Sequence, residues 1–424
     1  MTRIFFETLP VADVTTDGGL RLVYDRTWLA RRAAFPVSVT MPLQESPHPA
    51  ERLLPWLANL LPESHLSEIG QQLKVSPQDF LGMLEHLGRD TAGAMSVGQP
   101  RRQGTHVRPV ETEADLERII DELPAKPFLI GETGVSMSLA GVQDKLPVFV
   151  ASDGGICIPY DGTPSTHIMK PDANGRRLPG SVQNEAFCMT LARLCGLDVS
   201  DVTTGSAGKR NYLLVTRYDR VTDASGTVRR IHQEDLCQAL GRFPSEKYER
   251  GPVGGRPGPG LKDMFGAIGE HVSLGERLKF LDAVIFNVLT CNTDSHAKNY
   301  SILIGAGGST KMAPLYDLMC AAVYPQVDRM LPQRIGRRTD PAGLHGQDWQ
   351  AMAAEAGLSP SATLRRVAEL AEAVTDKAET AATQVEAMPA GGHPILVNIV
   401  HEVRKRCRRV LRQLSTGRAN GHAG

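Results

Sequence analysis

Apolar residues recur at helical spacing in several segments of the chain. The clearest pattern predicts a long helix from about Leu274 to Thr290, with apolar residues at 274, 278, 281, 285 and 288. Ser76 followed by Pro77 marks the expected start of a second helix. The helices predicted in this way, besides the long one, cover 51–61, 76–87, 111–123, 184–194 and 395–413. Beyond Asp348 the chain is expected to be mostly helical, with residues 417–424 frayed.

Short runs of β-branched and aromatic residues predict strands between these helices. The runs cover 21–29, 35–43, 147–152, 155–160, 166–171 and 212–219. Polar residues with glycine and proline at 98–110 predict a linker or exposed loop, and the Gly/Pro-rich segment 241–260 predicts a loop. Strands and helices are both predicted along the chain, and we expect an α+β protein.

Composition narrows the class of protein. The 424 residues carry 47 Lys and Arg against 47 Asp and Glu, so the chain has no overall basic coat, although a local basic patch is compatible with this balance. The seven cysteines form no CxxC pair, which favours a reduced, cytoplasmic protein without a zinc ribbon. No apolar run reaches the length of a membrane span, and the N-terminus lacks the pattern of a signal peptide.

The strongest chemical signal lies just after the long predicted helix. Asp294 is followed five residues later by Asn299, then by a predicted strand, a GAGGS turn, a second strand and Asp317. Protein kinases use this order: an Asp accepts the proton of the acceptor hydroxyl, and an Asn and a second Asp hold Mg²⁺ on the phosphates of ATP. Taken alone, Asp294 fits better with a surface loop in which it and Asn299 cap turns, and the upstream residues are needed to favour the kinase interpretation.

Upstream residues favour the kinase interpretation. Lys170 ends a predicted strand and Glu185 begins the following helix, as in the kinase pair that positions the ATP phosphates. Singly, Lys170 suits a solvated strand end, and Glu185 suits a helix N-terminus favoured by the dipole. The segment 136–145 is a small-residue loop with one glycine, so it is not a Walker A sequence, but its backbone N–H groups suit phosphates.

The order of these motifs resembles that of HipA-type toxin kinases, the serine/threonine kinases of bacterial toxin–antitoxin pairs. The resemblance covers nearly the whole chain. The segments that carry it are NLLPES (59–64), LGRDTAGA (87–94), SLAGVQDK (138–145), STHIMKPD (165–172), SVQNEAFC (181–188), VTRYDR (215–220), HQEDLCQALG (232–241), NTDSHAKNYSI (292–302) and APLYDL (313–318).

The resemblance implies a two-lobed protein-kinase-like core of the HipA and phosphoinositide-kinase type. Residues 1–99 would form a mixed α/β N-terminal subdomain, and 100–125 a linker with a short acidic helix. Residues 126–240 would form the N-lobe-like part. Residues 241–424 would form a mainly helical C-lobe that carries the catalytic loop and a basic C-terminal helix.

The resemblance also implies roles for individual residues. Asp294 would be the catalytic base, Asn299 and Asp317 the Mg²⁺ ligands, and Lys170, supported by Glu185, the ATP-phosphate lysine. The other ATP-contacting positions would be Ala140, Gly141, Val142, Gln143, Asp144, Lys145, Thr216, Arg217, Tyr218, His296, Ala297, Lys298 and Tyr316, with Asn299 and Asp317 among them. Asp144 stands where some members carry Glu. Ser138 matches a serine that the family autophosphorylates to switch itself off, with the nearby Ser136 as an alternative.

The family's protein partners follow from the same resemblance. The acceptor would be an aminoacyl-tRNA synthetase such as glutamyl-tRNA synthetase, whose phosphorylation stops growth. A HipB-like helix-turn-helix antitoxin would hold the toxin and repress its operon, which places the complex on the nucleoid. A non-catalytic corepressor, and a kinase with a lipid or metabolite acceptor, are the alternatives.

A basic run at 404–412 raises the question of direct DNA contact. Arg404, Arg408 and Arg412 lie off the apolar face of the predicted helix and suit phosphate contacts with operator DNA. Equally, the run suits a solvated face that balances Glu402 and the acids of 369–379. The segment 351–366 faintly resembles a helix-turn-helix, but ordinary helical packing is the favoured interpretation.

Overall fold

The computed structural model describes residues 1–173, 178–251 and 255–416. These residues divide into two compact units, and each unit is discontinuous in sequence. The first unit comprises 1–171, 206–244 and 301–311, and the second comprises 172–205, 245–300 and 312–424. The predicted boundaries near residues 99, 125 and 240 concern a different division of the chain and stay a prediction.

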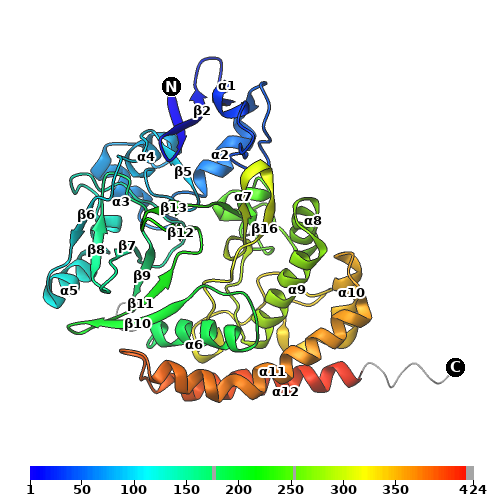
Figure 1. The fold of residues 1–424 in the computed structure, drawn as a ribbon. Coiled ribbons are helices and arrows are strands. Elements are labelled where there is room, and N and C mark those ends of the chain that lie inside the picture. The colour runs from blue at the N-terminus through cyan, green and yellow to red at the C-terminus, as the bar shows by residue number, and fades with distance from the viewer. Residues whose placement is uncertain (174–177, 252–254, 417–424) are drawn as a thin grey trace. The chain divides into compact units, whose positions relative to one another are not determined.

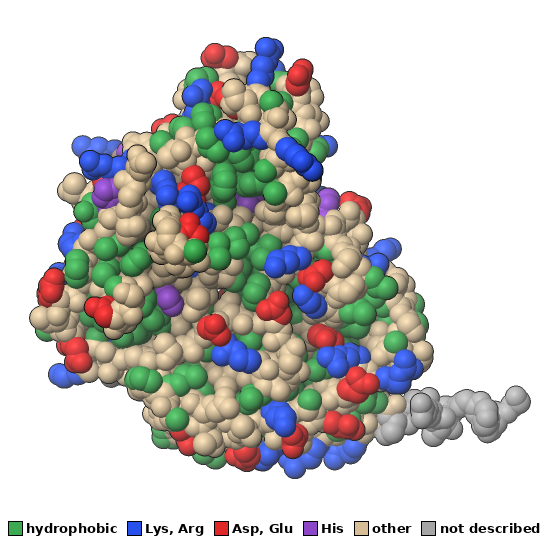
Figure 2. Space-filling model, in the orientation of Figure 1, with side chains coloured by type: hydrophobic (Ala, Val, Ile, Leu, Met, Phe, Trp, Pro, Cys, Tyr) green, Lys and Arg blue, Asp and Glu red, His purple; other side chains and the backbone are tan. Residues whose placement is uncertain are grey.

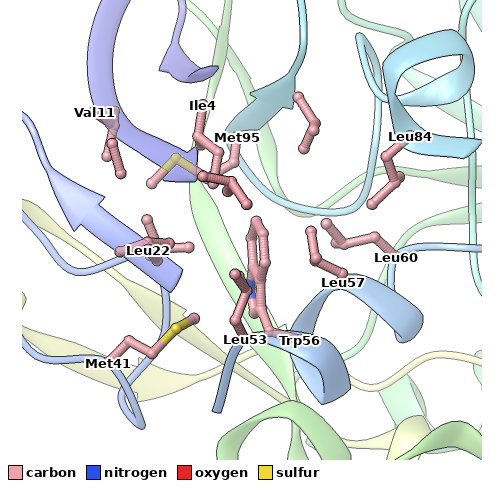
Figure 3. Close-up of a cluster of buried hydrophobic side chains, with 14 of the residues drawn as sticks. Ile4, Val11, Leu22, Met41, Leu53, Trp56, Leu57, Leu60, Leu84 and Met95 are labelled. Carbon is pink, nitrogen blue, oxygen red and sulfur yellow. The ribbon is translucent and has the colours of Figure 1, made fainter. Parts of the chain in front are cut away.

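The first unit begins with an antiparallel sheet in the order β4-β3-β2-β1-β5. Its strands are β1 Thr2–Phe6, β2 Leu9–Thr15, β3 Arg21–Tyr24, β4 His48–Pro49 and β5 Met95–Val97. The helices beside it are α1 Arg26–Leu29, α2 Ala50–Ala58, α3 Leu66–Leu73 and α4 Phe80–Leu87. Figure 3 shows the core that they bury, in which the Trp56 ring of α2 lies among aliphatic side chains of the sheet and of α4.

A second sheet of the same unit runs in the order β11-β9-β7-β8-β6. Its strands are β6 Val107–Pro109, β7 Leu146–Val150, β8 Ile156–Pro159, β9 His167–Pro171 and β11 Arg210–Thr216. Helix α5 Glu113–Glu122 packs its apolar side chains into the core of this sheet. The remaining strands are β10 Val202–Ala207, β12 Arg220–Thr222, β13 Val228–Arg230, β14 His232–Asp235, β15 Ser301–Ile304 and β16 Thr310–Met312, and α7 covers Leu236–Ala239.

The second unit is mainly helical. Its helices are α6 Ser181–Leu194, α8 Leu261–His271, α9 Leu274–Leu289, α10 Gly346–Glu355, α11 Pro360–Glu386 and α12 Ile395–Thr416. The long helices α11 and α12 lie side by side, and α6 packs against both (Figure 1). The predicted apolar face of α12 is confirmed, because Leu396, Ile399, Val403, Cys407 and Val410 are all buried.

Most predicted helices and strands are confirmed, and the α+β class with them, but the strand predicted over 21–29 ends at Tyr24 because Asp25 caps the helix Arg26–Leu29. The strand predicted over 35–43 is wrong, because only an isolated Ser38–Met41 bridge forms there. Two backbone groups of this segment bond to the Tyr24 hydroxyl instead of to a neighbouring strand. The hydroxyl accepts from the Val37 N–H at 2.8 Å and donates to the Met41 carbonyl. The alternating apolar residues therefore fill a core without forming a ladder.

The helix predicted from Ser76 begins later. Helix α4 starts at Phe80, because the Asp79 carboxylate accepts the Gly82 N–H at 2.9 Å and caps the first turn. Ser76 and Pro77 lie in the turn before it. The Gly/Pro-rich loop is confirmed where the structure describes it, apart from a short 3₁₀ turn at Pro244–Glu246. The predicted fraying of 417–424 lies outside the described residues.

The distribution of surface charge and the state of the cysteines agree with what the composition predicts. Lys and Arg side chains are interspersed with Asp and Glu over the face drawn in Figure 2, as the balanced charge leads one to expect. All seven cysteines are free thiols. Among the described helices, none combines the length and apolarity needed to cross a membrane.

Candidate active site

The loop that carries Asp294 is anchored to the end of helix α9 by buried amides. The Asn292 side chain donates to the Asn287 side-chain oxygen at 2.8 Å, and its backbone N–H donates to the Asn287 carbonyl at 2.8 Å. Asn287 donates in turn to the Tyr300 hydroxyl at 2.9 Å. The Asp294 N–H then donates to the Asn292 side-chain oxygen at 3.1 Å. Asn287, which is buried among apolar side chains in the last turns of α9, therefore holds the loop in place.

Asn299 closes this loop on Asp294. Its side-chain amide donates to the Asp294 carbonyl oxygen at 2.8 Å, within the 3₁₀ turn Ala297–Asn299. With the amide nitrogen used in this way, the Asn299 Oδ1 atom is the one that suits a cation. The predicted partners Asp294 and Asn299 are thus brought together.

The segment with Asp317 reaches the same loop. The Tyr316 hydroxyl donates to the Lys298 carbonyl at 2.7 Å. Asp317 itself has a φ of 59°, a left-handed backbone that costs a non-glycine residue about 1–3 kcal/mol. Strained backbone of this kind is often found at functional sites, where the surrounding structure holds it.

The residues of this site suit Mg²⁺. An Asn amide oxygen and an Asp carboxylate are hard oxygen ligands, and Mg²⁺ in kinases takes one or two such ligands together with phosphate oxygens and water. Among the described residues no group of three or more His, Cys, Asp or Glu forms a metal site.

His296 lies buried in the middle of the loop. Burial, helped by the neighbouring Lys247 ammonium, lowers the pKa of His296 to about 3, so the ring is neutral at physiological pH. Its Nδ1 atom has no hydrogen-bond partner among the residues that the structure describes. The ring therefore presents a neutral, desolvated nitrogen at a position predicted to contact ATP.

Sequence reasoning missed one residue of this site, Tyr248. Its hydroxyl donates a hydrogen bond to the Asp294 carboxylate, and its ring stands edge-on to His296 at 5.0 Å between centroids. Tyr248 lies in the loop predicted over 241–260, where no local pattern marks it. Only its contact with the catalytic loop reveals it.

The predicted phosphate loop, Ala140–Lys145, lies in the first unit and has its own anchors. Gly141 has a φ of 111°, and its carbonyl accepts the Glu63 N–H at 3.2 Å. The Ser64 hydroxyl donates to the Val142 carbonyl at 3.1 Å. Lys145 Nζ donates to the Ala140 carbonyl at 2.6 Å. The NLLPES motif thus supports the loop, a role that the sequence did not reveal.

A pocket opens beside this loop. Its lining comes from the phosphate loop and from two other segments of the first unit: Pro62, Ser64, His65, Leu123, Pro127, Phe128, Gly141, Gln143, Asp144 and Lys145. His65 Nε2 lies 3.6 Å from the Asp144 carboxylate. The exposed Val142 shows that the tip of the loop faces solvent.

The two candidate serines differ sharply in environment. Ser138 is fully buried, with its hydroxyl donating to the Leu60 carbonyl at 2.7 Å and its N–H donating to the Asp90 carbonyl at 3.0 Å. Ser136 is half-buried and donates to the His86 carbonyl at 2.6 Å. In this conformation Ser138 has no path to a phosphate donor.

The other predicted nucleotide positions of the first unit lie on strands β9 and β11. Lys170 is buried and pairs in register with Leu213, and Thr216 ends β11 opposite His167. The Tyr218 hydroxyl donates to the Gln233 side chain at 2.6 Å. Glu185 is buried in α6 of the second unit, so the predicted pair of Lys170 with Glu185 stays a prediction.

The side chain of Arg217 is directed into the interior of the first unit, although the residue is at a position predicted to contact the nucleotide. Its guanidinium is buried and donates to Asp219 at 2.9 and 2.7 Å, to the Ser165 hydroxyl at 2.9 Å and to the Thr91 carbonyl at 2.8 Å. A side chain held in this way is committed to the interior, which leaves only the backbone of Arg217 for a nucleotide.

The basic run of α12 divides into two kinds of arginine. Arg404 is ion-paired with Glu379 of α11 and donates to the Thr375 carbonyl at 3.2 Å, as the charge-balancing interpretation expects. Arg408 and Arg412 are exposed. The 351–366 segment spans the end of α10 and the start of the 27-residue α11, which pack against each other, and its interpretation as ordinary helical packing stays a prediction.

Comparisons with known proteins identify the family. The HipA N-terminal domain model matches residues 2–98, and the HipA-like C-terminal domain model matches residues 137–380. "Putative kinase Y4mE" of Sinorhizobium fredii is 39% identical over 387 residues, which cover 88% of this chain and 90% of that protein. The serine/threonine-protein kinase toxin HipA of Shewanella oneidensis is 30% identical over 83% of this chain and 81% of its own length.

The fold agrees with these sequence matches. A solved structure of Shewanella oneidensis MR-1 HipA with HipB and its operator DNA superposes with a TM-score of 0.82 at 24% identity. The superposition covers 97% of this chain and 98% of that one, and it confirms the predicted kinase-like fold of the HipA type. The chain therefore belongs to the HipA family of serine/threonine-protein kinases.

Proposed function

We propose that this chain is a growth-arresting toxin kinase that transfers the γ-phosphate of ATP to a serine of another protein. The observation that carries the proposal is the loop in which Asn299 closes on Asp294 while buried Asn287 and Asn292 hold it in place. A loop kept only as a surface turn would need no such buried support.

Each residue has a role in this reaction. The Asp294 carboxylate accepts the proton of the acceptor hydroxyl as that oxygen attacks phosphorus. Asn299 and Asp317 would hold Mg²⁺, which neutralises charge on the phosphates when it is bound. Lys170, supported by Glu185, would bind phosphate oxygens. The backbone of the Ala140–Lys145 loop would cradle the phosphates, and the backbone of Thr216–Tyr218 would lie beside the adenine.

Autophosphorylation of Ser138 would switch the kinase off. Its hydroxyl occupies a fully buried site against the Leu60 carbonyl. A phosphoserine carries about −1.5 to −2 charges at neutral pH and cannot return to that site without burying them against an acceptor oxygen. The loop that carries the phosphoserine would therefore stay outside the buried site beside Leu60. Ser136 is the alternative site.

The partners proposed are those that the family resemblance implies. The acceptor would be an aminoacyl-tRNA synthetase, glutamyl-tRNA synthetase or a relative, and phosphorylation would stop tRNA charging in the cytoplasm. A HipB-like helix-turn-helix antitoxin would neutralise the toxin and bring it to operator DNA on the nucleoid. The Shewanella complex supports this assembly. Exposed Arg408 is better placed for DNA phosphates than the ion-paired Arg404, and Arg412 is a further candidate contact.

Intact-mass measurement before and after incubation with Mg-ATP tests the proposal. We expect the wild type to gain one phosphate that maps to Ser138, and Asp294→Asn to gain none. A wild type that is already phosphorylated would show this in its starting mass. If neither protein gains phosphate although both bind ATP, the kinase proposal fails and a non-catalytic corepressor becomes the better interpretation. Loss of growth arrest in Asp294→Asn would separate the two in cells.

A further inference from the structure

A short segment of the second unit, Ser245–Glu249, rests on the catalytic loop. The Tyr248 hydroxyl donates to the Asp294 carboxylate, and the Tyr248 ring meets His296 at 5.0 Å with an interplanar angle of 87°. One residue earlier, the Lys247 carbonyl accepts the Ala297 N–H at 3.1 Å. Side-chain and backbone contacts together fix the segment against the loop.

The other side of the segment is fixed as well. The Glu249 N–H donates to the Pro332 carbonyl at 3.1 Å, and the Glu249 carboxylate accepts from Arg334 Nε at 2.7 Å and from its backbone N–H at 2.6 Å. The position of Tyr248 is therefore determined from both flanks.

Gly258 completes the support. Its N–H donates to the Tyr248 carbonyl at 3.1 Å. A Cβ at this position would lie 2.3 Å from the Tyr248 carbonyl oxygen and 2.0 Å from that of Glu246. Only glycine permits so close an approach, so the sequence is adapted to this placement of Tyr248.

The contact has a chemical consequence for the proposed reaction, on which this inference rests. The base of a kinase accepts a hydrogen bond from the acceptor hydroxyl before it takes the proton. We propose that Tyr248 is an acceptor-site gate: its phenol hydroxyl holds the place of the acceptor hydroxyl on Asp294. A protein acceptor has to displace it before transfer.

The gate determines which acceptors react. A hydrogen bond to a carboxylate is among the stronger ones in proteins, so water or a loosely bound hydroxyl displaces it poorly. A protein acceptor that binds over an extended surface compensates for the loss of this bond. Tyr248 is thus a specificity-determining residue that protects ATP from hydrolysis while no acceptor is bound.

The test uses water as the acceptor. The purified full-length chain is incubated with Mg-ATP, and ADP release is followed for the wild type, Tyr248→Phe, Asp294→Asn and the double variant. We expect Tyr248→Phe to raise kcat for ATP hydrolysis about three- to tenfold with KM for ATP unchanged, since one hydrogen bond to a charged group is removed. The double variant should lose this gain.

Two further variants sharpen the result. Tyr160→Phe is the matched control, because the Tyr160 ring also packs against a histidine, His106 at 5.7 Å, and both residues lie at strand ends far along the chain from the loop. It should leave hydrolysis unchanged. Arg334→Ala removes the side-chain contact with Glu249, so it should raise hydrolysis in the same direction as Tyr248→Phe without touching Asp294.

The outcomes separate the gate from the kinase proposal. If the wild type forms ADP in an Asp294-dependent way but Tyr248→Phe is no faster, or is slower at an unchanged melting temperature, the gate is wrong and Tyr248 positions the base. Phosphate mapped to Tyr248 would also overturn the gate, since the residue would then be an acceptor. If no variant forms ADP or phosphoprotein in an Asp294-dependent way, both proposals fail.

Discussion

The side-chain amide of Asn299 donates to the backbone carbonyl of Asp294 across 2.8 Å, so the residue proposed to hold Mg²⁺ also shapes the loop of the proposed base. Replacing it should therefore affect metal use and loop geometry together. The two effects can be told apart, because only the first depends on the concentration of the metal.

Asn299→Ala is expected to lower the rate of autophosphorylation on the order of 100-fold, because small displacements of a catalytic group cost about that much. It should also raise the Mg²⁺ concentration needed for half-maximal rate. Initial rates across a Mg²⁺ titration measure both. Asn398→Ala, on the exposed face of α12, is the control. An unchanged Mg²⁺ requirement would show that Asn299 is no ligand.

Lys170→Ala should remove phosphate positioning while leaving the fold intact. The residue is buried on β9, and we expect kcat/KM for ATP to fall on the order of 100-fold. Lys209→Ala, in the exposed turn before β11, should behave like the wild type. Kinetics and melting temperature are measured on the same preparations. A sharp fall in the melting temperature would instead assign Lys170 a structural role.

A buried charge cluster supports the first unit, and it joins two of the motifs that define the family resemblance. Asp90 of LGRDTAGA accepts from Arg220 at 2.9 Å, and Gly93 of the same motif donates its N–H to Asp219 at 2.7 Å. Arg220 and Asp219 belong to VTRYDR. The three neighbouring arginines, above all Arg220, hold the pKa of Asp90 well below its usual range despite its burial.

Asp90→Asn should therefore destabilise the chain strongly. Removing one partner of a buried ion pair costs about 3–5 kcal/mol, because three buried arginines lose the carboxylate that they share and Asp219 alone is left to balance Arg217 and Arg220. Asp13→Asn is the matched control. The Asp13 carboxylate lies 2.7 Å from Arg3 Nε, and the Arg3 side chain is 40% exposed. Such surface pairs contribute about 0–1 kcal/mol to stability. Thermal unfolding compares the two, and equal shifts in melting temperature would contradict the prediction.

Local patterns predicted the elements that carry the site. Helical periodicity found α9 and α12, and the spacing of Asp294 to Asn299 found a loop that the structure does close. Local patterns did not predict hydrogen bonds between residues that lie far apart in the sequence. Nothing near Asn59–Ser64 indicates that it supports the phosphate loop, some 80 residues away.

The wrong strand prediction over 35–43 and the interior position of the Arg217 side chain have a common physical cause. The alternation over 35–43 arises because the segment packs into a core and uses the Tyr24 hydroxyl in place of a neighbouring strand. The Arg217 side chain is held in the interior by Asp219 and Ser165, while the predicted nucleotide contact of this residue stays a prediction. In each case a tertiary partner decides the structure, and a single sequence does not reveal that partner.

The last prediction concerns Glu234, which is fully buried on β14. Its Oε1 atom accepts the Val39 N–H at 2.9 Å, while Oε2 has no hydrogen-bond partner among the described residues. Burial raises the pKa of Glu234 to about 8, from 4.5 for an exposed carboxyl. Between these values the folded chain keeps a proton that the unfolded chain has lost, so the free energy of unfolding falls as pH rises.

Glu234→Gln removes this titration while keeping the size of the side chain. Relative to the wild type, the variant should gain stability progressively between about pH 4.5 and 8 and gain no more above pH 8. The measurement is the difference in melting temperature between the two proteins across that range. His232 on the same strand contributes the opposite slope, because burial lowers its pKa to about 4, but it is common to both proteins and cancels in the difference. Glu68→Gln, on the exposed face of α3, is the control and should show no such trend. A difference that stays constant with pH would show that Glu234 is ionised in the folded chain throughout, and that its environment is more polar than the contacts with Val39 and Ser38 indicate.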